Sequence, residues 1–298
     1  MPRIPNKRIL IVGIGTWGQK VFRLLRTDRK LSVTQISARE FAGNSRRAKF
    51  KSLFDLVWIC TKPELQISIL ESLNHSHVET ERVILEKPFA VNADQLSRLV
   101  SIVQEAPYES FASAPWSYSE QWKSSKEFFD QSGIHRNISI TRGGDHLRDY
   151  VTPEQDWLIH DLMLLQDLEK ENAQNLQVAK CRCYSIYGSG HLIGMLSDAS
   201  KWHLQGGYIS HSRIAVWRVE TEELILTVNF QNGSRIVERR DGKILQNTTF
   251  DNSRVLNSMA SDIICDRIGS GDVVSTLKLS RYLFQPKEYG DAQIRYLT

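Results

Sequence analysis

Hydrophobic residues in the first half of the chain form short runs that alternate with helical patterns. The run "RILIV" (8–12) is apolar throughout, which is typical of a strand buried on both faces. After it, Trp17, Val21, Leu24 and Leu25 recur at helical spacing. The same alternation continues with predicted strands at 32–37, 55–61, 82–88 and 109–115 and with the helices "PELQISILESL" and "NADQLSRLVSIV". Strands that alternate with helices predict an α/β fold with a parallel, doubly wound sheet.

The pattern changes to longer, β-rich segments from about residue 136. "QNGS" (231–234) and "RDGK" (240–243) join such segments and predict hairpins, and the chain ends in two helical runs broken at "GSGD" (269–272). Partial alternation in "RIAVWRVE" predicts a sheet with one covered and one open face. We therefore expect a first domain over 1–118 and a second over 119–298. The second is an α+β domain with a large, mostly antiparallel open sheet, whose C-terminal helices can pack back on the first domain.

Composition narrows the classes of function. Of 298 residues, 41% are hydrophobic and 24% charged, with a net charge of +4, so neither disorder nor nucleic-acid binding is indicated. The four cysteines lack a disulfide framework, and the Cys181–Cys183 pair lacks the histidines of a zinc site, so no metal is expected. The first apolar run is too short to span a membrane. These features favour a cytoplasmic protein.

A glycine loop follows the first strand. "GIGTWG" places Gly13, Gly15 and Gly18 in a G-x-G-x-x-G pattern that opens a helix, with Thr16 and Trp17 between them. The first glycine permits the tight turn, the second lets the backbone approach a pyrophosphate, and the third lets helix and strand pack closely. The N–H groups at the start of the helix can then bind the anion. The loop predicts a Rossmann domain that binds a dinucleotide.

The end of the second strand bears on which dinucleotide is bound. "QISAR" places Ser37 and Arg39 where an acidic residue would bind the ribose hydroxyls of NAD. Without that carboxylate, and with Arg39 able to pair with a phosphate, NADP is favoured and NAD stays possible. Arg46 and Arg47 can add to such a phosphate site.

Two further segments carry groups suited to catalysis. "VILEKPFA" places Glu86, Lys87 and Pro88 at the carboxyl end of a strand, where we expect Glu86 to hold the lysine ammonium. "QDWLIHDLMLL" (155–165) reads as a helix start, with Asp156 and His160 on one face. For these two residues the alternative is a helix cap and a core histidine. Asp161 is interpreted as a first-turn acid favoured by the helix dipole.

These segments, together with "VWICTKPELQ", resemble the Gfo/Idh/MocA family of oxidoreductases in order and spacing over essentially the whole chain. "DWLIHD" looks most like the D-x-x-x-H-D variant of that family, in a compact member. The resemblance implies a Rossmann domain joined to a substrate domain with a large open sheet. It also implies that Lys87 binds the substrate oxygen and the nicotinamide ribose, and that His160 is the general acid/base, because an imidazole titrates near neutral pH. Asp156 would orient His160 or contact substrate, and Thr61 and Pro63 would lie along the cofactor.

Three functions stay open on these residues. The resemblance implies an NAD(P)-dependent oxidoreductase that acts on a carbonyl, alcohol or imine carbon, with members that act on sugars and sugar nucleotides. Compact members include reductases of bilins and cyclic imines, which act on rather flat substrates. The segments "HLRDY" (146–150) and "WHLQGG" (202–207) could line a pocket for such a substrate, although we favour the interpretation that both are surface loops. The third is a non-catalytic NADP-binding sensor or accessory protein. Two departures from the family pattern favour it: Gln66 stands where members usually carry a histidine, and the usual Gly-rich run before the D-x-x-x-H helix is missing. The presence of Lys87 and His160 opposes it. Expected partners are a small-molecule substrate and a second copy of the chain, through the open sheet face around Trp217, with neither nucleic acid nor membrane.

Overall fold

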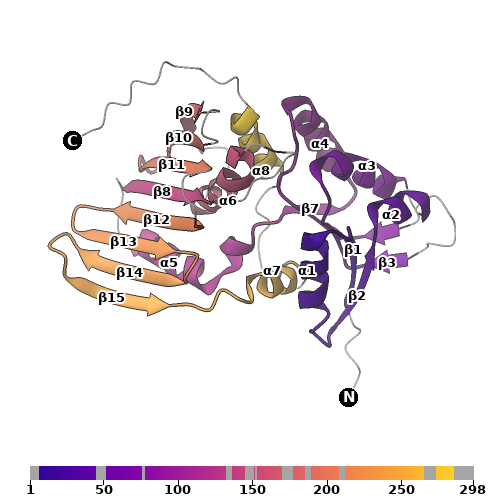
Figure 1. Cartoon of the computed structure of the whole chain (residues 1–298), viewed down its shortest axis with the longest axis horizontal. Coiled ribbons are helices and arrows are strands. Elements are labelled where there is room, and N and C mark those ends of the chain that lie inside the picture. The colour runs from indigo at the N-terminus through magenta and orange to yellow at the C-terminus, as the bar shows by residue number, and fades with distance from the viewer. Residues whose placement is uncertain are drawn as a thin grey trace.

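The described part of the protein contains a five-stranded and an eight-stranded sheet and a two-stranded ribbon, with helices around and between the two larger sheets (Figure 1). The computed structural model describes residues 7–44, 52–75, 78–131, 136–144, 151, 153–169, 177–184, 189–207, 212–264 and 273–284. Among these residues, no helix is long and apolar enough to cross a membrane.

The first sheet has five parallel strands in the order β2-β1-β4-β6-β7. Its strands are β1 (Lys7–Val12), β2 (Leu31–Ile36), β4 (Leu56–Ile59), β6 (Arg82–Leu85) and β7 (Glu109–Ala112). All five strands expected from the hydrophobic runs are therefore present. The sheet is buried on both faces, since Ile9, Leu10, Ile11 and Val12 are all fully shielded from solvent. Its connecting helices are α1 (Thr16–Leu25), α2 (Ala38–Asn44), α3 (Pro63–Asn74) and α4 (Ala93–Glu105).

Local signals fix the helix boundaries only in part. The side chain of Asn92 accepts a hydrogen bond from the Gln95 amide at 2.8 Å and so caps α4 as predicted. The Gln95 side chain accepts from the Val91 amide at 2.7 Å, one residue before the position that a capping box requires. Two elements were not predicted: helix α2, and a parallel ribbon of β3 (Ser52–Phe54) with β5 (Val78–Thr80).

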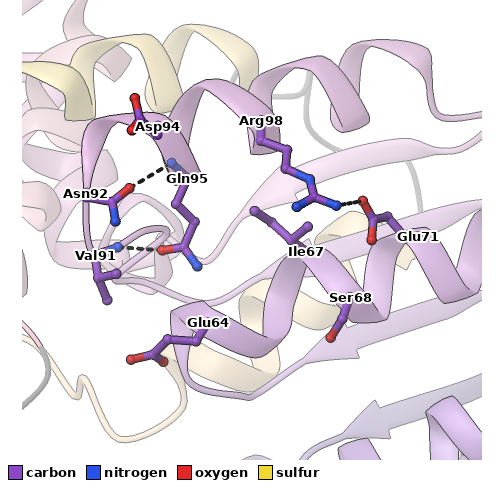
Figure 2. A pocket seen from close by; sticks show the side chains of 9 residues that line it. All are labelled: Glu64, Ile67, Ser68, Glu71, Val91, Asn92, Asp94, Gln95 and Arg98. Carbon is purple, nitrogen blue, oxygen red and sulfur yellow. Dashed lines mark hydrogen bonds and ion pairs between the residues drawn. The ribbon is translucent and has the colours of Figure 1, made fainter.

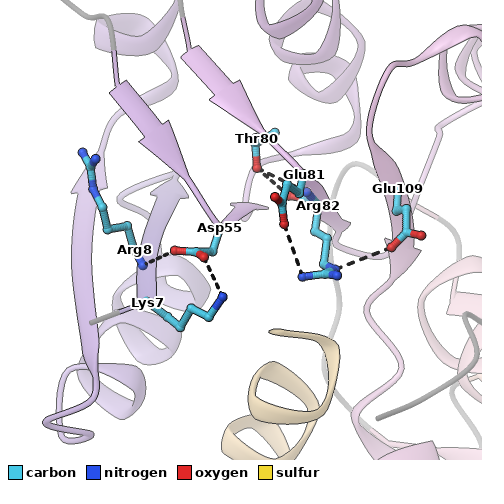
Figure 3. Close-up of polar contacts among 7 residues, drawn as sticks. All are labelled: Lys7, Arg8, Asp55, Thr80, Glu81, Arg82 and Glu109. Carbon is cyan, nitrogen blue, oxygen red and sulfur yellow. Dashed lines mark hydrogen bonds and ion pairs between the residues drawn. The ribbon is translucent and has the colours of Figure 1, made fainter. Parts of the chain in front are cut away.

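Ion pairs close the edge of this sheet at which its strands begin (Figure 3). Lys7 pairs with Asp55 at 2.8 Å, and Asp55 also accepts a hydrogen bond from the Arg8 amide at 2.7 Å. Arg82 lies 3.5 Å from Glu109 at the starts of two neighbouring strands. The partners are partly exposed, so each pair contributes little to stability. The opposite edge, where the strands end, is where ligands bind in sheets of this type.

The second sheet has eight strands in the order β15-β14-β13-β12-β8-β11-β10-β9, with β8 and β11 parallel and every other pair antiparallel. The segment between the sheets forms η2 (Pro115–Tyr118) and α5 (Glu120–Gln131). The strands are β8 (Asn137–Gly143), β9 (Gln177–Tyr184), β10 (Ser189–Met195), β11 (Lys201–Gly207), β12 (Ile214–Glu220), β13 (Leu224–Asn229), β14 (Ser234–Arg239) and β15 (Ile244–Thr249). Both predicted hairpins are present, with Gly233 and Gly242 at positive φ in their turns. The α+β class predicted for this half is confirmed.

Two interpretations of this half were wrong. "WHLQGG" is not a surface loop: it belongs to β11, and its Trp202 is buried under α6 (Pro153–Leu168). Trp217 does not lie on the open face, because Ala215, Trp217 and Val219 are the buried positions of β12. "HLRDY" lies outside the described residues.

The C-terminal helices connect the two halves. Helix α7 (Val255–Ile264) contacts α1 and η2, and α8 (Val273–Ser280), which η4 (Arg281–Phe284) follows, contacts α4 and β7 as well as α6. The break expected at "GSGD" lies outside the described residues. These contacts fix α6 relative to the carboxyl edge of the parallel sheet, and α6 carries the residues of the second candidate catalytic segment.

Candidate active site

The glycine loop occupies the turn between β1 and α1, beside the end of β4. A Cβ on Gly13 would lie 2.2 Å from the Cys60 carbonyl oxygen, and the φ of Gly13 is 132°, so only glycine fits there. A Cβ on Gly18 would lie 2.3 Å from the carbonyl oxygen of Gly13, which explains the close packing of helix on strand. A Cβ on Gly15 would meet nothing within 4 Å. Gly15 therefore borders open space at the start of α1.

The residues around that space fit an anionic cofactor. Gly15 is the N-cap of α1 and offers no capping side chain, so the first N–H groups of the helix can bind an anion. Thr61 is the second residue after β4, and its buried hydroxyl oxygen has no hydrogen-bond partner among the described residues. Between β1 and β4 the strand order reverses, which is the position of the ligand crevice in doubly wound sheets. Pro63 is buried as the first residue of α3, and Trp17 is 36% exposed in the loop.

The end of β2 carries a carboxylate that the sequence interpretation overlooked. The Glu40 side chain accepts a hydrogen bond from the Ser37 amide at 2.8 Å, and the Ser37 hydroxyl accepts from the Glu40 amide at 3.1 Å. This is the reciprocal S-x-x-E capping box of α2, and the signal was present in "SARE". The hydrogen bonds from Ser37 hold the pKa of Glu40 below its usual range. Arg39 is exposed beside this box, whereas Arg46 and Arg47 lie outside the described residues.

Lys87 and Asp156 bring the two halves of the protein together. The Lys87 ammonium donates to Asp156 Oδ1 at 2.6 Å and to the Asp156 backbone oxygen at 3.0 Å. The two side chains are only 14% and 6% exposed, so the pair is largely shielded from water. A lysine that follows β6 is therefore held against the second turn of α6.

Glu86, which we expected to hold the Lys87 ammonium, acts on it through its charge, while the hydrogen bonds of the ammonium described above go to Asp156. Successive side chains of an extended chain point in opposite directions, and the Glu86 carboxylate points into the core. It accepts hydrogen bonds from Trp58 Nε1 at 2.9 Å and Ser113 Oγ at 2.7 Å. Burial raises the pKa of the Glu86 carboxyl, while hydrogen bonds from Trp17, Ser113 and Trp58 act in the other direction. Glu86 thus supports the start of α1 and the sheet, and its charge also interacts with that of Lys87.

Gln66 supports the same turn. Its side-chain amide is fully buried and donates to the carbonyl oxygens of Glu86 at 2.7 Å and Pro88 at 3.3 Å. Because these carbonyls flank Lys87, Gln66 holds the backbone from which the lysine projects. Its presence in this position is explained by that contact.

His160 is half-buried one helical turn after Asp156, on the same face of α6. Side chains four residues apart on a helix are neighbours, so the imidazole belongs to the face that meets Lys87. Since α6 begins at Pro153, Asp156 is not its N-cap; its carboxylate accepts a hydrogen bond from the Lys87 ammonium.

Asp161 is not a first-turn acid, as had been expected, because it lies in the third turn of α6 and is fully buried. Its carboxylate accepts hydrogen bonds from Arg142 at 2.5 and 2.8 Å and from Trp217 Nε1 at 2.7 Å. This ion pair fastens α6 to β8 and β12. It thereby fixes the helix face that carries Asp156 and His160.

A groove of 480 Å³ lies elsewhere, between α3 and α4 (Figure 2). The ion pair of Arg98 with Glu71 spans it, and the hydrogen bond from the Val91 amide to Gln95 lies at one end. None of the candidate cofactor-binding or catalytic residues lines this groove. It is separate from the site described above.

Comparison with known proteins finds likeness in structure only. No protein-family model matches the chain, and no curated protein matches it. Among solved structures, UDP-N-acetylglucosamine 3-dehydrogenase of Acidithiobacillus ferrooxidans is 15% identical with a TM-score of 0.70, over 93% of this chain and 95% of that one. An NAD-binding oxidoreductase of Klebsiella pneumoniae is 12% identical with a TM-score of 0.73, over 93% and 95%. Biliverdin reductase of Synechocystis, solved with biliverdin and NADP+, is 13% identical with a TM-score of 0.66, over 93% and 96%.

This likeness shows the fold. It covers both halves of the chain, so the order of a Rossmann-like sheet followed by a large, mostly antiparallel sheet is shared with these enzymes. Which chemistry this chain performs depends on its own residues.

Proposed function

We propose that this protein is an NADP-dependent oxidoreductase that transfers hydride between the nicotinamide and a carbonyl, alcohol or imine carbon of a small molecule. The observation that carries the proposal is the contact of Lys87 with Asp156, one helical turn from His160 and at the ligand edge of a sheet that also carries the glycine loop. The likeness in structure to a dehydrogenase, an NAD-binding oxidoreductase and a reductase supports it.

Each residue has a separate task in this proposal. Gly13 and Gly18 shape the loop, and the open space at Gly15 receives the cofactor pyrophosphate at the start of α1. When bound, the cofactor supplies the hydride donor or acceptor at C4 of its ring. The Lys87 ammonium, which Asp156 orients, binds the oxygen or nitrogen attached to the reacting carbon and stabilises charge that develops there. His160 donates or removes the proton at that atom.

The preference for NADP rests on the end of β2. No carboxylate stands at Ser37 itself, and the exposed Arg39 guanidinium can pair with a 2′-phosphate. Glu40 opposes this preference. Its carboxylate lies 2.8 Å from the Ser37 amide nitrogen, where its negative charge would repel a 2′-phosphate. A direct comparison of NADPH and NADH affinity, repeated with Arg39→Gln, tests the preference: the variant is expected to lose affinity for NADPH alone.

Catalysis is favoured over a sensor role by what the unusual residue Gln66 does. It supports the backbone on both sides of Lys87 through two buried hydrogen bonds, so it fits an intact catalytic turn. A protein that only sensed NADP would have no use for a shielded lysine–aspartate pair held across the two halves.

We also propose that the open face of the second sheet, where Ile193 and Met195 are exposed, joins two copies of the chain.

The test is turnover in variants that still bind cofactor. NADPH oxidation would be followed with a panel of aldehydes, ketones and imines, and NADP+ reduction with the corresponding alcohols. Lys87→Met and His160→Asn are expected to abolish turnover while the affinity for NADPH stays within a few-fold of wild type. The matched control is Lys126→Met, since Lys126 also pairs with an aspartate, Asp167 at 3.0 Å, but away from the site. Unchanged turnover in Lys87→Met would contradict the proposal.

A further inference from the structure

Trp157 lies on α6 next to the proposed catalytic face. It is three residues before His160, so the two side chains are neighbours on the helix surface, with Cβ atoms about 5–6 Å apart. A Cβ built on Gly144, just past the end of β8, would lie 3.3 and 3.4 Å from two carbons of the indole ring. The glycine therefore lets the ring lie close against the chain. Trp157 and Gly144 thus join the end of β8 to the catalytic face of α6.

Arg213 completes this corner from a third element. It directly precedes β12, whose first residue Ile214 pairs with Gly143, so Arg213 stands at the same end of the sheet as Gly144. Its guanidinium carbon lies 5.9 Å from the centre of the Trp157 ring, and its Cγ would be 3.5 Å from a Cβ on Gly144. The Arg213 side chain is exposed. An aromatic ring and a cation therefore stand side by side, and the ring belongs to the residue three positions before His160 on α6.

Both groups are hydrogen-bond donors that lack an acceptor. Trp157 Nε1 is shielded from solvent and has no hydrogen-bond partner among the described residues. Arg213 likewise has no carboxylate partner among the residues that the structure describes. By contrast, Arg142 is paired with Asp161 and Arg218 with Glu220. A buried donor without a partner is destabilising, so native proteins rarely keep one without a reason. What this corner lacks is an acceptor, and an anion suits both donors.

We propose that Trp157 and Arg213 form an anion-binding subsite for the substrate, which therefore carries a carboxylate or phosphate group within a few bonds of its reacting carbon. A guanidinium binds either group with two parallel hydrogen bonds, and the indole N–H supplies a third donor. The indole face covers the flat part of the substrate beside that group. The assignment to a substrate rests on the proposed function, because it takes His160 as the residue that faces the reacting carbon.

Calorimetric titration of the whole protein, saturated with NADP+ so that the pyrophosphate site is occupied, tests the subsite. Inorganic phosphate and malonate serve as probes, and the tighter of the two identifies the group. Arg213→Gln is expected to weaken binding of the preferred probe by about tenfold or more, and Trp157→Phe, which keeps the ring but removes the N–H, by several-fold. Arg213→Lys is expected to fall between wild type and Arg213→Gln because it restores the charge.

The matched control is Arg218→Gln, which removes the same charge from β12, the strand that Arg213 precedes, at a residue already paired with Glu220. Equal affinities in Arg213→Gln and Arg218→Gln, or a wild-type protein that binds neither probe, would overturn the subsite. NADPH affinity is measured separately. A wild-type protein that does not bind NADPH would contradict the proposed function. Anion binding that depends on Arg213 would still support an anion site at this corner.

Discussion

Substituting Asp161 by asparagine tests how strongly α6 is fastened to the large sheet. The Asp161 side chain is fully buried and its partner Arg142 is only 4% exposed, so the substitution leaves a guanidinium charge without compensation in the interior. Breaking one partner of a buried ion pair costs about 3–5 kcal/mol. Domains of this kind have a free energy of unfolding of about 5–15 kcal/mol, so the loss is a large share of the total. Urea unfolding followed by tryptophan fluorescence measures it.

The matched control is Asp167→Asn on the same helix. Asp167 also accepts from a tryptophan, Trp122 at 2.6 Å, and from a cation, Lys126 at 3.0 Å, but this ion pair is 32% exposed on both sides. We expect a loss of about 1 kcal/mol or less there, as for other exposed pairs. Replacing Arg142 and Asp161 together by methionine and leucine should cost less than Asp161→Asn alone, because no buried charge remains. Equal losses in Asp161→Asn and Asp167→Asn would refute the reasoning.

Further predictions concern the glycine loop and two buried titratable sites. Gly18→Ala should lower the free energy of unfolding by roughly 1–3 kcal/mol because the added carbon meets the Gly13 carbonyl at 2.3 Å, whereas Gly15→Ala should leave stability unchanged and weaken NADPH binding in a fluorescence titration; the reverse order would contradict this. Burial raises the pKa of the Glu86 carboxyl, so the folded state binds its proton more tightly than the unfolded state does. As pH rises above the usual carboxyl range, the wild type should therefore lose stability relative to Glu86→Gln. Parallel stability–pH curves for the two proteins would show the idea to be wrong. Burial lowers the pKa of His203, so the unfolded state binds the proton more tightly than the folded state does. The wild type should therefore lose stability as pH falls below about 6.5, and His203→Gln should lose less. The same stability–pH profile in both proteins would disprove this.

Features set by local sequence were predictable here. The glycine loop depends on three residues within six positions, and each constraint on it comes from its own backbone or the adjacent strand end. The hairpin glycines, Gly233 and Gly242, act over four residues in the same way. The capping box of Ser37 and Glu40 was equally local. It was overlooked because a carboxylate was sought at the end of the strand and not in the first turn of the helix after it.

Contacts between distant segments were less predictable. Lys87 and Asp156 are 69 residues apart, and the sequence offered Glu86 as a nearer partner. The choice depends on which side of the chain each side chain takes where β6 ends. In β12 the face opposite Trp217 begins with Ile214 and Val216 before it turns polar at Arg218 and Glu220, so the alternation is incomplete and does not by itself place Trp217 in the core. Strands β10 and β11 contain glycine and histidine and lack an unbroken apolar run, and they were not expected.

A crystal structure of the protein grown with NADP+ tests the proposed active site most directly. We expect the pyrophosphate to lie against Gly15 at the start of α1 and the nicotinamide to lie beside the Lys87–Asp156 pair. C4 of the nicotinamide should face the space next to His160. A cofactor bound elsewhere, or a nicotinamide turned away from Lys87 and His160, would contradict the proposed chemistry.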